Sequence, residues 1–415
     1  MMKRKLIMQM RNEWRSNIWM MTELFIVGLV LWLIFTLLNT LTARHQEPEG
    51  VDYSDVYVGS LGYIEKESEF FSPYDENHGY KTDYEMLAAN LGSNPYVEIV
   101  GRGNNAVPYS YNFMGNAVTS TVNGKKESYL GNCRELSPEA VKAIRMHGLN
   151  GETPDELAEI IRRGDIILTG NENPENTTDI RDWRGKDAFF GSDSAQVRNI
   201  GAVVNVIRRT DYELSYYGNI LSDASGDRAS QIIIRVKEGR GQEFMNSLNG
   251  NDLEFGNVYV SDLQSLEDRK EICHYDIRVL QRNMMIFSIF VLVSVFLGFL
   301  GTFWFRTQQR VPELALRKVN GATDADLFRR IIGEGLLLLV IPVILLLPTG
   351  LGLIGFFDSI RVLRMSVSGT AGENWIIWSA FAMTVCSLAV MIVAGIWMPA
   401  RKAMKVEPAT ALKDQ

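Results

Sequence analysis

The sequence has 415 residues, of which 46% are hydrophobic and 22% are charged, and its formal net charge is −7. This length would accommodate two or three soluble domains. The hydrophobic residues, however, are concentrated in four long runs, which excludes an ordinary soluble protein.

The four runs are predicted to cross a membrane. They are Leu24–Leu41, Met284–Phe305, Ile331–Phe357 and Trp375–Met398, and each has about the 17–25 residues that a bilayer requires. The first run is longer than the apolar core of a typical signal peptide, about 7–15 residues, so we expect an uncleaved anchor. The predicted fold class is a membrane protein with four transmembrane α-helices and one large α+β extracytoplasmic domain between helices 1 and 2.

The predicted segments follow one another without gaps. In chain order they are a cytoplasmic amphipathic interfacial helix (1–21), transmembrane helix 1 (22–42), the extracytoplasmic domain (43–282), transmembrane helix 2 (283–306), a cytoplasmic coupling hairpin (307–330), transmembrane helix 3 (331–357), a short outer loop (358–373), transmembrane helix 4 (374–398) and a cytoplasmic tail (399–415).

The segment before the first run has apolar residues at every fourth position. Leu6, Met10, Trp14 and Ile18 share one face, and basic residues fill the other. This pattern is typical of a helix that lies on a membrane surface. A simple extension of the first membrane helix is the alternative.

Lysine and arginine near the membrane ends predict the orientation. Basic residues cluster before the first run, between the second and third runs, and after the fourth, so we expect both termini and the hairpin to be cytoplasmic. Segment 43–282 holds 25 basic and 39 acidic residues, a formal charge of −14, whereas the remainder is +7. The basic side suits anionic lipid headgroups, and the acidic domain argues against a nucleic-acid partner.

Two strand–helix–strand patterns frame the outer segment. VDYSDVYVGS, DYEMLAANL and PYVEIVGR form the first pattern, and QIIIRVK, GQEFMNSLN and NVYVSDL form the second. Between them we predict an inserted lobe, about 104–199, on a βαβ platform. The lobe contains two expected helices, SPEAVKAIRMHGL with the cap Ser137 and TPDELAEIIRRG with a capping box at Thr153 and Glu156. Cys133 and Cys273 share this compartment, and a disulfide between them is left open.

The polar hairpin RVPELALRKVNGATDADLFRR is specified by local signals. Pro312 suits the first turn of a helix, and Glu313 lies four residues before Arg317, which favours an ion pair. Asn320-Gly321 predicts a left-handed exit. Thr323 with Asp326 predicts the cap of the next helix.

We expect the hairpin helix to offer an apolar edge made of Leu314, Leu316 and Val319. Such a helix could dock in a groove of a partner and transmit motion into the membrane helices. Resting on lipid is the alternative that the residues leave open.

The stretch RVPELALRKVNGAT resembles the cytoplasmic loop of MacB/FtsX-type permeases of ABC transporters. The tail MPARKAMKVEPATALK resembles the closing motif of the family, with Pro399, Ala400 and Arg401 directly after the last run. Glu334 falls where the family often has a glutamate, and we expect it to interact with the N-terminal dipole of its helix. Pro342 and Pro348 should bend the third membrane helix.

The resemblance implies a non-catalytic subunit that couples to a separate cytoplasmic ABC ATPase. The implied coupling residues are Pro312, Glu313, Leu314, Leu316, Arg317, Lys318, Val319, Gly321, Ala322 and Thr323, and the implied membrane-entry residues are Glu334, Pro399, Ala400 and Arg401. The chain itself is expected to bind no cofactor or metal, because it has no G-x-x-x-x-G-K-[ST] loop and its four histidines lack ligand spacing. ATP and Mg²⁺ would bind the partner.

Two functions follow from the resemblance. The first is export or extraction of a lipoprotein, peptide or toxic small molecule, by a dimer with a second copy or a paralogue and with a periplasmic adaptor and an outer-membrane channel. The second is FtsX-like control of a cell-wall hydrolase or a signalling partner. A membrane-anchored enzyme is a weaker third possibility, because no nucleophile–base arrangement is apparent.

Overall fold

The structure is a computed structural model that describes residues 14–46, 50–75, 78–109, 112–172, 179–190, 197–208, 210–212, 215–309, 311–359 and 374–404. The chain divides into two units. Unit 2 is Arg44–Asp276, and unit 1 is formed by Met1–Ala43 together with Ile277–Gln415.

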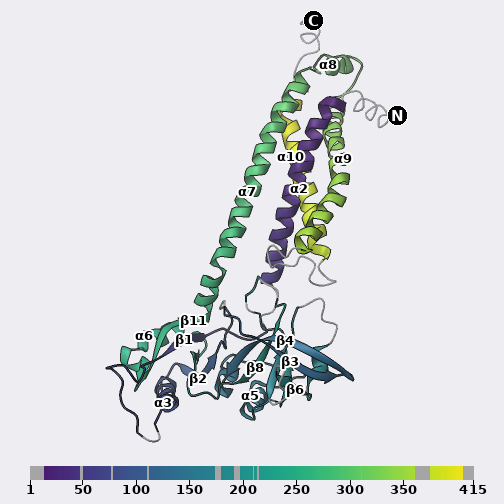
Figure 1. Cartoon of the computed structure of the whole chain (residues 1–415). Helices are drawn as coiled ribbons and strands as arrows, with labels where there is room; N and C mark the ends of the chain where they lie inside the picture. Colours follow the sequence, from purple (N-terminus) through teal and green to yellow (C-terminus); the bar gives the residue numbers. More distant parts are fainter. Residues whose placement is uncertain are drawn as a thin grey trace. The chain divides into compact units, whose positions relative to one another are not determined.

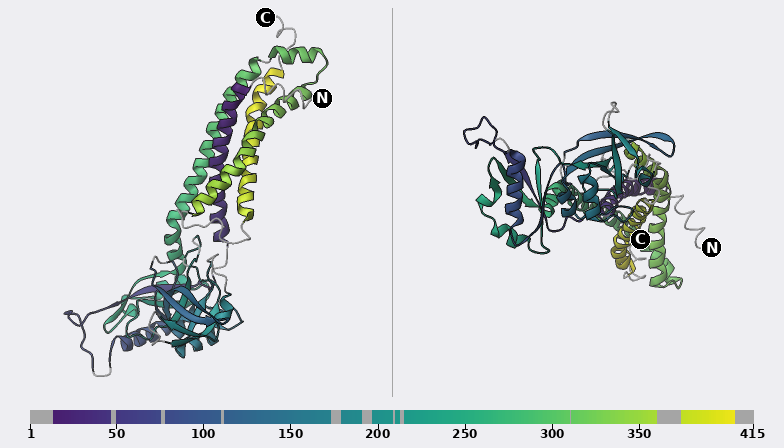
Figure 2. Two further views of the ribbon diagram at one scale, coloured as in Figure 1. Left: turned by 45° about the vertical axis from the view of Figure 1, so that its right-hand side comes forward. Right: turned by 90° about the horizontal axis from the view of Figure 1, so that it is seen from below.

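Unit 1 is built from long helices that run side by side (Figures 1 and 2). They are α2 (Trp14–His45), α7 (Leu266–Gln309), α9 (Asp324–Ser359) and α10 (Asn374–Met404), with the short α8 (Val311–Val319) between α7 and α9. Among the described residues, four helices are long and apolar enough to cross a membrane. An α-helix pairs most of its backbone N–H and C=O groups within itself, as a hydrocarbon environment demands.

The helices of unit 1 pack through two apolar clusters. The larger cluster joins all four long helices, with Leu24 of α2, Phe299 of α7, Leu339 of α9 and Ile392 of α10 among its members. The second cluster centres on Trp32, a fully buried side chain in α2. Its indole N–H donates to the Ile377 carbonyl of α10 at 3.2 Å. Gly350 of α9 is required beside it, because a Cβ there would overlap the indole ring.

Several predicted boundaries in unit 1 differ from the structure. α2 is one helix from Trp14 onward, so no break separates an interfacial helix from the first span at residue 21, and residues 1–13 lie outside the described part. α10 continues to Met404, beyond the predicted end of helix 4 at 398, and Pro399 lies inside it. Residues 360–373 and 405–415, most of the predicted outer loop and tail, also lie outside the described residues.

The platform of unit 2 is a four-stranded sheet with two helices. The strands β1 (Val56–Tyr63), β2 (Val97–Asn104), β9 (Gln231–Val236) and β11 (Val258–Ser265) lie in the order β11-β1-β9-β2, and all neighbours are antiparallel. The two-residue strand β10 (Glu254–Phe255) extends β11. Helix α3 (Tyr80–Gly92) follows β1 and α6 (Gly241–Ser247) follows β9. The two predicted strand–helix–strand patterns are therefore present, in a ferredoxin-like strand order.

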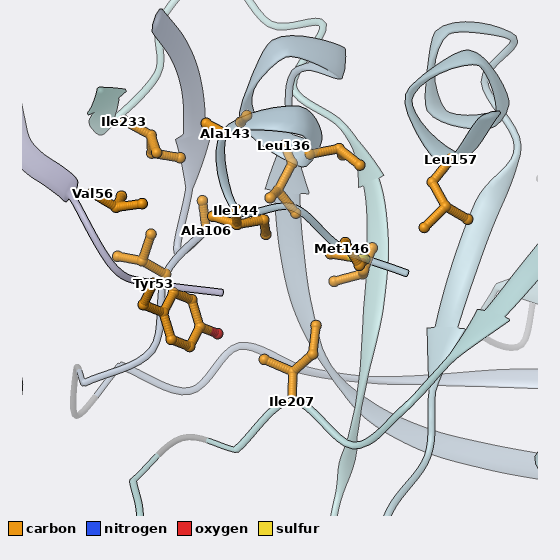
Figure 3. Close-up of a cluster of buried hydrophobic side chains, with 14 of the residues drawn as sticks. Tyr53, Val56, Ala106, Leu136, Ala143, Ile144, Met146, Leu157, Ile207 and Ile233 are labelled. Atoms are coloured by element: carbon orange, nitrogen blue, oxygen red, sulfur yellow. The ribbon is translucent and has the colours of Figure 1, made fainter. Parts of the chain in front are cut away.

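The central strand β9 is buried on both faces, which explains its continuous apolar sequence. Ile232 and Ile234 point to the cluster that holds Leu87 of α3 and Phe244 of α6. Ile233, on the opposite face, points to the cluster that Figure 3 shows, with Val56 of β1. Successive residues of a strand face opposite sides, so one strand serves both clusters.

The insertion between β2 and β9 folds as a closed barrel rather than a separate lobe. Its strands are β3 (Gly115–Val122), β4 (Lys125–Leu136), β5 (Ile166–Thr169), β6 (Asp187–Phe190), β7 (Val197–Val204) and β8 (Gly218–Asp223). They pair in the order β4-β3-β6-β7-β5-β8, and a parallel β4–β8 pairing closes the ring. The predicted end of the insertion at 199 is wrong, because it falls within β7, and the insertion continues to β9.

The barrel and the platform share a sheet and a core. Gly103 and Asn104 of β2 pair with the end of β4. Two helices of the insertion, α4 (Pro138–Ala143) and α5 (Pro154–Arg162), contribute side chains to the cluster in Figure 3, which also contains platform residues. This shared core explains why Arg44–Asp276 forms one unit.

The caps predicted for the insertion helices are present. Ser137 accepts the Ala140 N–H at the start of α4, and Thr153 and Glu156 form the capping box of α5. Helix α4 is shorter than predicted, because the backbone turns at Arg145, whose φ is 46°. No disulfide joins Cys133 and Cys273 in the described part of the chain, and their side chains pack against different apolar clusters.

Tyr129 links strands of the barrel through a buried hydrogen bond. Its hydroxyl donates to the Thr169 carbonyl at 2.7 Å, with the Asn219 carbonyl at 3.3 Å. Burial raises the pKa of this hydroxyl, so it stays a proton donor. A Cβ at Gly218 would overlap the hydroxyl, so glycine is needed there.

Replacing Tyr129 with Phe should therefore destabilise unit 2 by about 1–2 kcal/mol, because two buried carbonyls lose their donor. Thermal unfolding of the detergent-solubilised chain measures this. Tyr217→Phe, at an exposed tyrosine, is the matched control and should unfold as the wild type does. Equal stability of all three proteins would contradict the role of Tyr129.

Candidate functional site

The hairpin between α7 and α9 is the candidate site. An ion pair links two residues of its first helix, α8. Glu313 accepts from Arg317 Nε at 3.1 Å and from Arg317 Nη2 at 2.6 Å. The two residues are four apart with the acid first, as predicted. Both are exposed, so the pair contributes only a few tenths of a kcal/mol.

The turn after α8 is a Schellman motif. The Gly321 N–H donates to the Lys318 carbonyl at 3.0 Å, and the Ala322 N–H donates to the Arg317 carbonyl at 3.0 Å. Gly321 has a φ of 90°, a left-handed conformation that glycine adopts without strain. The left-handed exit predicted from Asn320-Gly321 is therefore present.

The next helix begins with the predicted capping box. The Asp326 N–H donates to Thr323 Oγ1 at 3.2 Å, and the Thr323 hydroxyl donates to Asp326 Oδ2 at 2.6 Å. An ion pair that was not predicted from the sequence crosses the turn. Lys318 Nζ lies 2.7 Å from Asp324 Oδ1. The end of α8 and the start of α9 are thus held together by backbone, cap and ion-pair interactions.

The predicted apolar edge is only partly exposed. Leu314 is 8% exposed, because it packs against Leu327 of α9, which is 2% exposed, with Ala322 and Ile331 beside them. Leu314 therefore belongs to the core of the hairpin, and its predicted place on an exposed apolar edge is wrong. Leu316 and Val319 are 54% and 63% exposed, and they lie three residues apart on one face of α8.

Glu334 is not at a helix start. α9 begins at Asp324, so Glu334 lies about three turns inside, beyond the reach of the N-terminal dipole. It instead accepts from Arg330 Nε at 3.1 Å. The expected dipole interaction is wrong, because the helix begins before the apolar run does. Pro342 and Pro348 both lie within the same continuous helix.

Pro399, Ala400 and Arg401 of the closing motif lie on α10, which contacts α8. The part of the motif from residue 405 onward lies outside the described residues. Ala400 is fully buried in the large cluster of unit 1. The Arg401 guanidinium lies 4.6 Å from the centre of the Trp397 ring, and Lys402 Nζ lies 4.5 Å from that of Trp304 in α7. The hairpin residues therefore come together in space, whereas Glu334 and the closing motif occupy neighbouring helices.

The last three long helices and the hairpin match a known family. A family model described as FtsX-like permease C-terminal covers residues 285–408. Residues 285–408 are therefore of the MacB/FtsX permease type. This confirms the resemblance predicted from Arg310–Thr323 and from the tail. The chain is a membrane protein with a large domain between its first two long apolar helices.

The permease also resembles a curated protein and a solved structure. It is 22% identical over 353 residues, 82% of its length, to the Macrolide export ATP-binding/permease protein MacB of Acinetobacter baylyi. The match covers 49% of that protein, so the chain spans about half the length of this relative. The solved structure is the extracellular domain of noncanonic ABC-type transporter YknZ from Gram-positive bacteria. The sequence identity is 11%, the match covers 49% of this chain and 100% of that chain, and the TM-score is 0.27.

Substituting Gly321 with Val should unfold the end of α8, because a β-branched residue in the left-handed conformation costs about 1–2 kcal/mol. Hydrogen exchange of hairpin amides in the full chain is the measurement, and faster exchange over Lys318–Asp326 is expected. Gly333→Ala, in α9 with open space around it, is the control and should leave the exchange unchanged. Unchanged exchange in Gly321→Val would refute the motif as the source of rigidity.

Proposed function

We propose that this permease couples ATP hydrolysis by a separate cytoplasmic ABC ATPase subunit to movement of its outer domain. The observation that carries the proposal is the continuity of α7. The helix begins at Leu266, directly after the last residue of β11, and ends at Gln309, two positions before Val311, where α8 begins. At about 1.5 Å per residue, its 44 residues form a rod of roughly 66 Å.

The hairpin has the rigidity that an element needs to transmit a displacement from the ATPase. Its turn is closed by the Schellman motif, the capping box and the Lys318–Asp324 ion pair, so a force on α8 is not absorbed by a flexible loop. The exposed face with Leu316 and Val319 would enter a groove of the ATPase. α9 would carry the same displacement into the membrane, because it is one helix from Asp324 to Ser359.

The chain's own residues supply no nucleotide chemistry in this proposal. The ATPase binds ATP and Mg²⁺, and the permease converts its closure into motion. The basic residues near the hairpin and both ends favour a cytoplasmic location for these parts in a bacterial inner membrane. Anionic lipids would face the same basic side.

For the cargo, we propose export or extraction of a lipoprotein, a peptide or a toxic small molecule at the outer face. The relative's name, a macrolide export protein, supports transport over regulation. A dimer with a second copy or a paralogue, and an adaptor with an outer-membrane channel, complete the proposed assembly. Recovery of a cell-wall hydrolase on the outer domain would instead favour an FtsX-like regulatory role.

Leu316→Asp and Val319→Asp should each reduce ATPase co-purification from source cells in mild detergent at least tenfold, because a charge would enter an apolar interface. Mass spectrometry of the captured proteins is the measurement. Val197→Asp, at an exposed apolar residue of the barrel, is the matched control and should retain the ATPase. Undiminished capture by both hairpin variants would contradict the proposed docking face.

The proposed orientation has its own test. A cysteine replacing Asn320, which is exposed in the hairpin turn, should resist a membrane-impermeant maleimide in intact cells. A cysteine replacing Lys126, which is exposed in the outer domain, should react under the same conditions. Labelling of the hairpin cysteine in intact cells would contradict the proposed orientation.

A further inference from the structure

A buried carboxylate lies where two long helices enter unit 2. Asp211, between β7 and β8, is 3% exposed. Its Oδ2 lies 3.1 Å from Nδ1 of His45, the last residue of α2, and 2.9 Å from Nζ of Lys270, in the second turn of α7. One side chain therefore contacts two helices whose contact residues are more than 200 positions apart in the chain.

Further contacts fix the orientation of this carboxylate. The Tyr109 hydroxyl donates to Asp211 Oδ1 at 3.2 Å. The Asp211 backbone N–H donates to His274 Nε2 at 3.3 Å, one turn along α7 from Lys270. The Tyr212 ring stacks on the His45 ring at 5.5 Å and meets the His274 ring edge-on at 4.8 Å.

A second carboxylate holds the end of α2. Glu172 pairs with Arg208, lies 3.7 Å from Arg44 Nη1, and accepts the Ser215 N–H at 2.7 Å. Arg208 Nη1 also donates to the backbone carbonyl of Arg44 at 3.0 Å, a position where a helix end leaves carbonyls to be satisfied. Arg44 and Arg208 are both buried.

These contacts coincide with the border of unit 2 on both helices. Unit 2 begins at Arg44 on α2 and ends at Asp276 on α7, immediately beside His45 and His274. Buried charges are costly unless they are paired and hydrogen-bonded. Such an arrangement has few alternative geometries, because moving one partner leaves the other charge unpaired in a buried place.

We propose that Asp211 is a positioning residue that clamps the end of α2 and the start of α7 onto the outer domain. Displacement of either helix would then move unit 2 as one body instead of bending its junctions. The mechanical role rests on the proposed function. The clamp itself, however, is a property of this chain alone and is tested without an ATPase.

The first experiment measures amide hydrogen exchange of the full chain in nanodiscs. Asp211→Asn should accelerate exchange about tenfold or more in both residues 40–46 and residues 266–276, because each helix loses a charge-assisted hydrogen bond. His45→Gln should accelerate only the α2 segment, and Lys270→Gln only the α7 segment. Asp187→Asn, at an exposed aspartate of the barrel, is the control and should alter neither.

Exchange in the barrel strands and in β9 reports whether the variants remain folded, and it should match the wild type. If Asp211→Asn leaves both helix ends as protected as in the wild type, or releases only one of them, the clamp is refuted. Asp211→Glu, which retains the charge, should restore protection at least partly. A structural role independent of charge would give no such rescue.

The second experiment separates the clamp from the proposed function. In the complex with the ATPase, trapping with ATP and vanadate should change exchange in the wild-type hairpin and outer domain. Asp211→Asn should keep the hairpin response and lose the outer-domain response. If the clamp variants behave as expected but no ATPase binds the wild type, the proposed function fails and the clamp stands. An outer-domain response that persists in Asp211→Asn would overturn the mechanical role.

Discussion

A helix satisfies its backbone hydrogen bonds internally, and the rest of this structure depends on that constraint. It allows α7 to run unbroken from the end of β11 to Gln309, through a stretch apolar enough to lie in hydrocarbon. A loop at either end would leave unsatisfied amides or a flexible joint. Leu266, the first residue of α7, directly follows Ser265, the last residue of β11.

The local chemistry of the hairpin could be predicted from sequence, whereas its packing could not. The ion pair of Glu313 with Arg317, the left-handed Gly321 and the cap at Thr323 involve residues at most four apart, so their signals are local. Leu314 was assigned to the surface because its partner Leu327 is 13 positions away, across the turn. The position of Glu334 within its helix could not be predicted for a related reason. The apolar run begins at Ile331, whereas α9 begins at Asp324.

The same division applies to the outer domain. The short strand-like segments at β1 and β9, the second of them a continuous apolar run, predict the platform, because a strand carries its burial pattern in its own sequence. The barrel was missed, because its closure pairs Gly131 with Gly218 and its interior depends on Tyr129 reaching Thr169. Neither relation leaves a periodic signal. The Asp211 cluster was missed likewise, since it gathers residues from four distant segments.

Ring closure has a consequence for the protein outside the membrane. An open sheet presents a row of unpaired amides and carbonyls at its border, and these can recruit a strand from another molecule. In the described part of unit 2, one end of the sheet turns back on itself through the β4–β8 pairing, and the other finishes in the two-residue β10. A barrel closed in this way can be crowded at a membrane surface with little opportunity for strand exchange between neighbours.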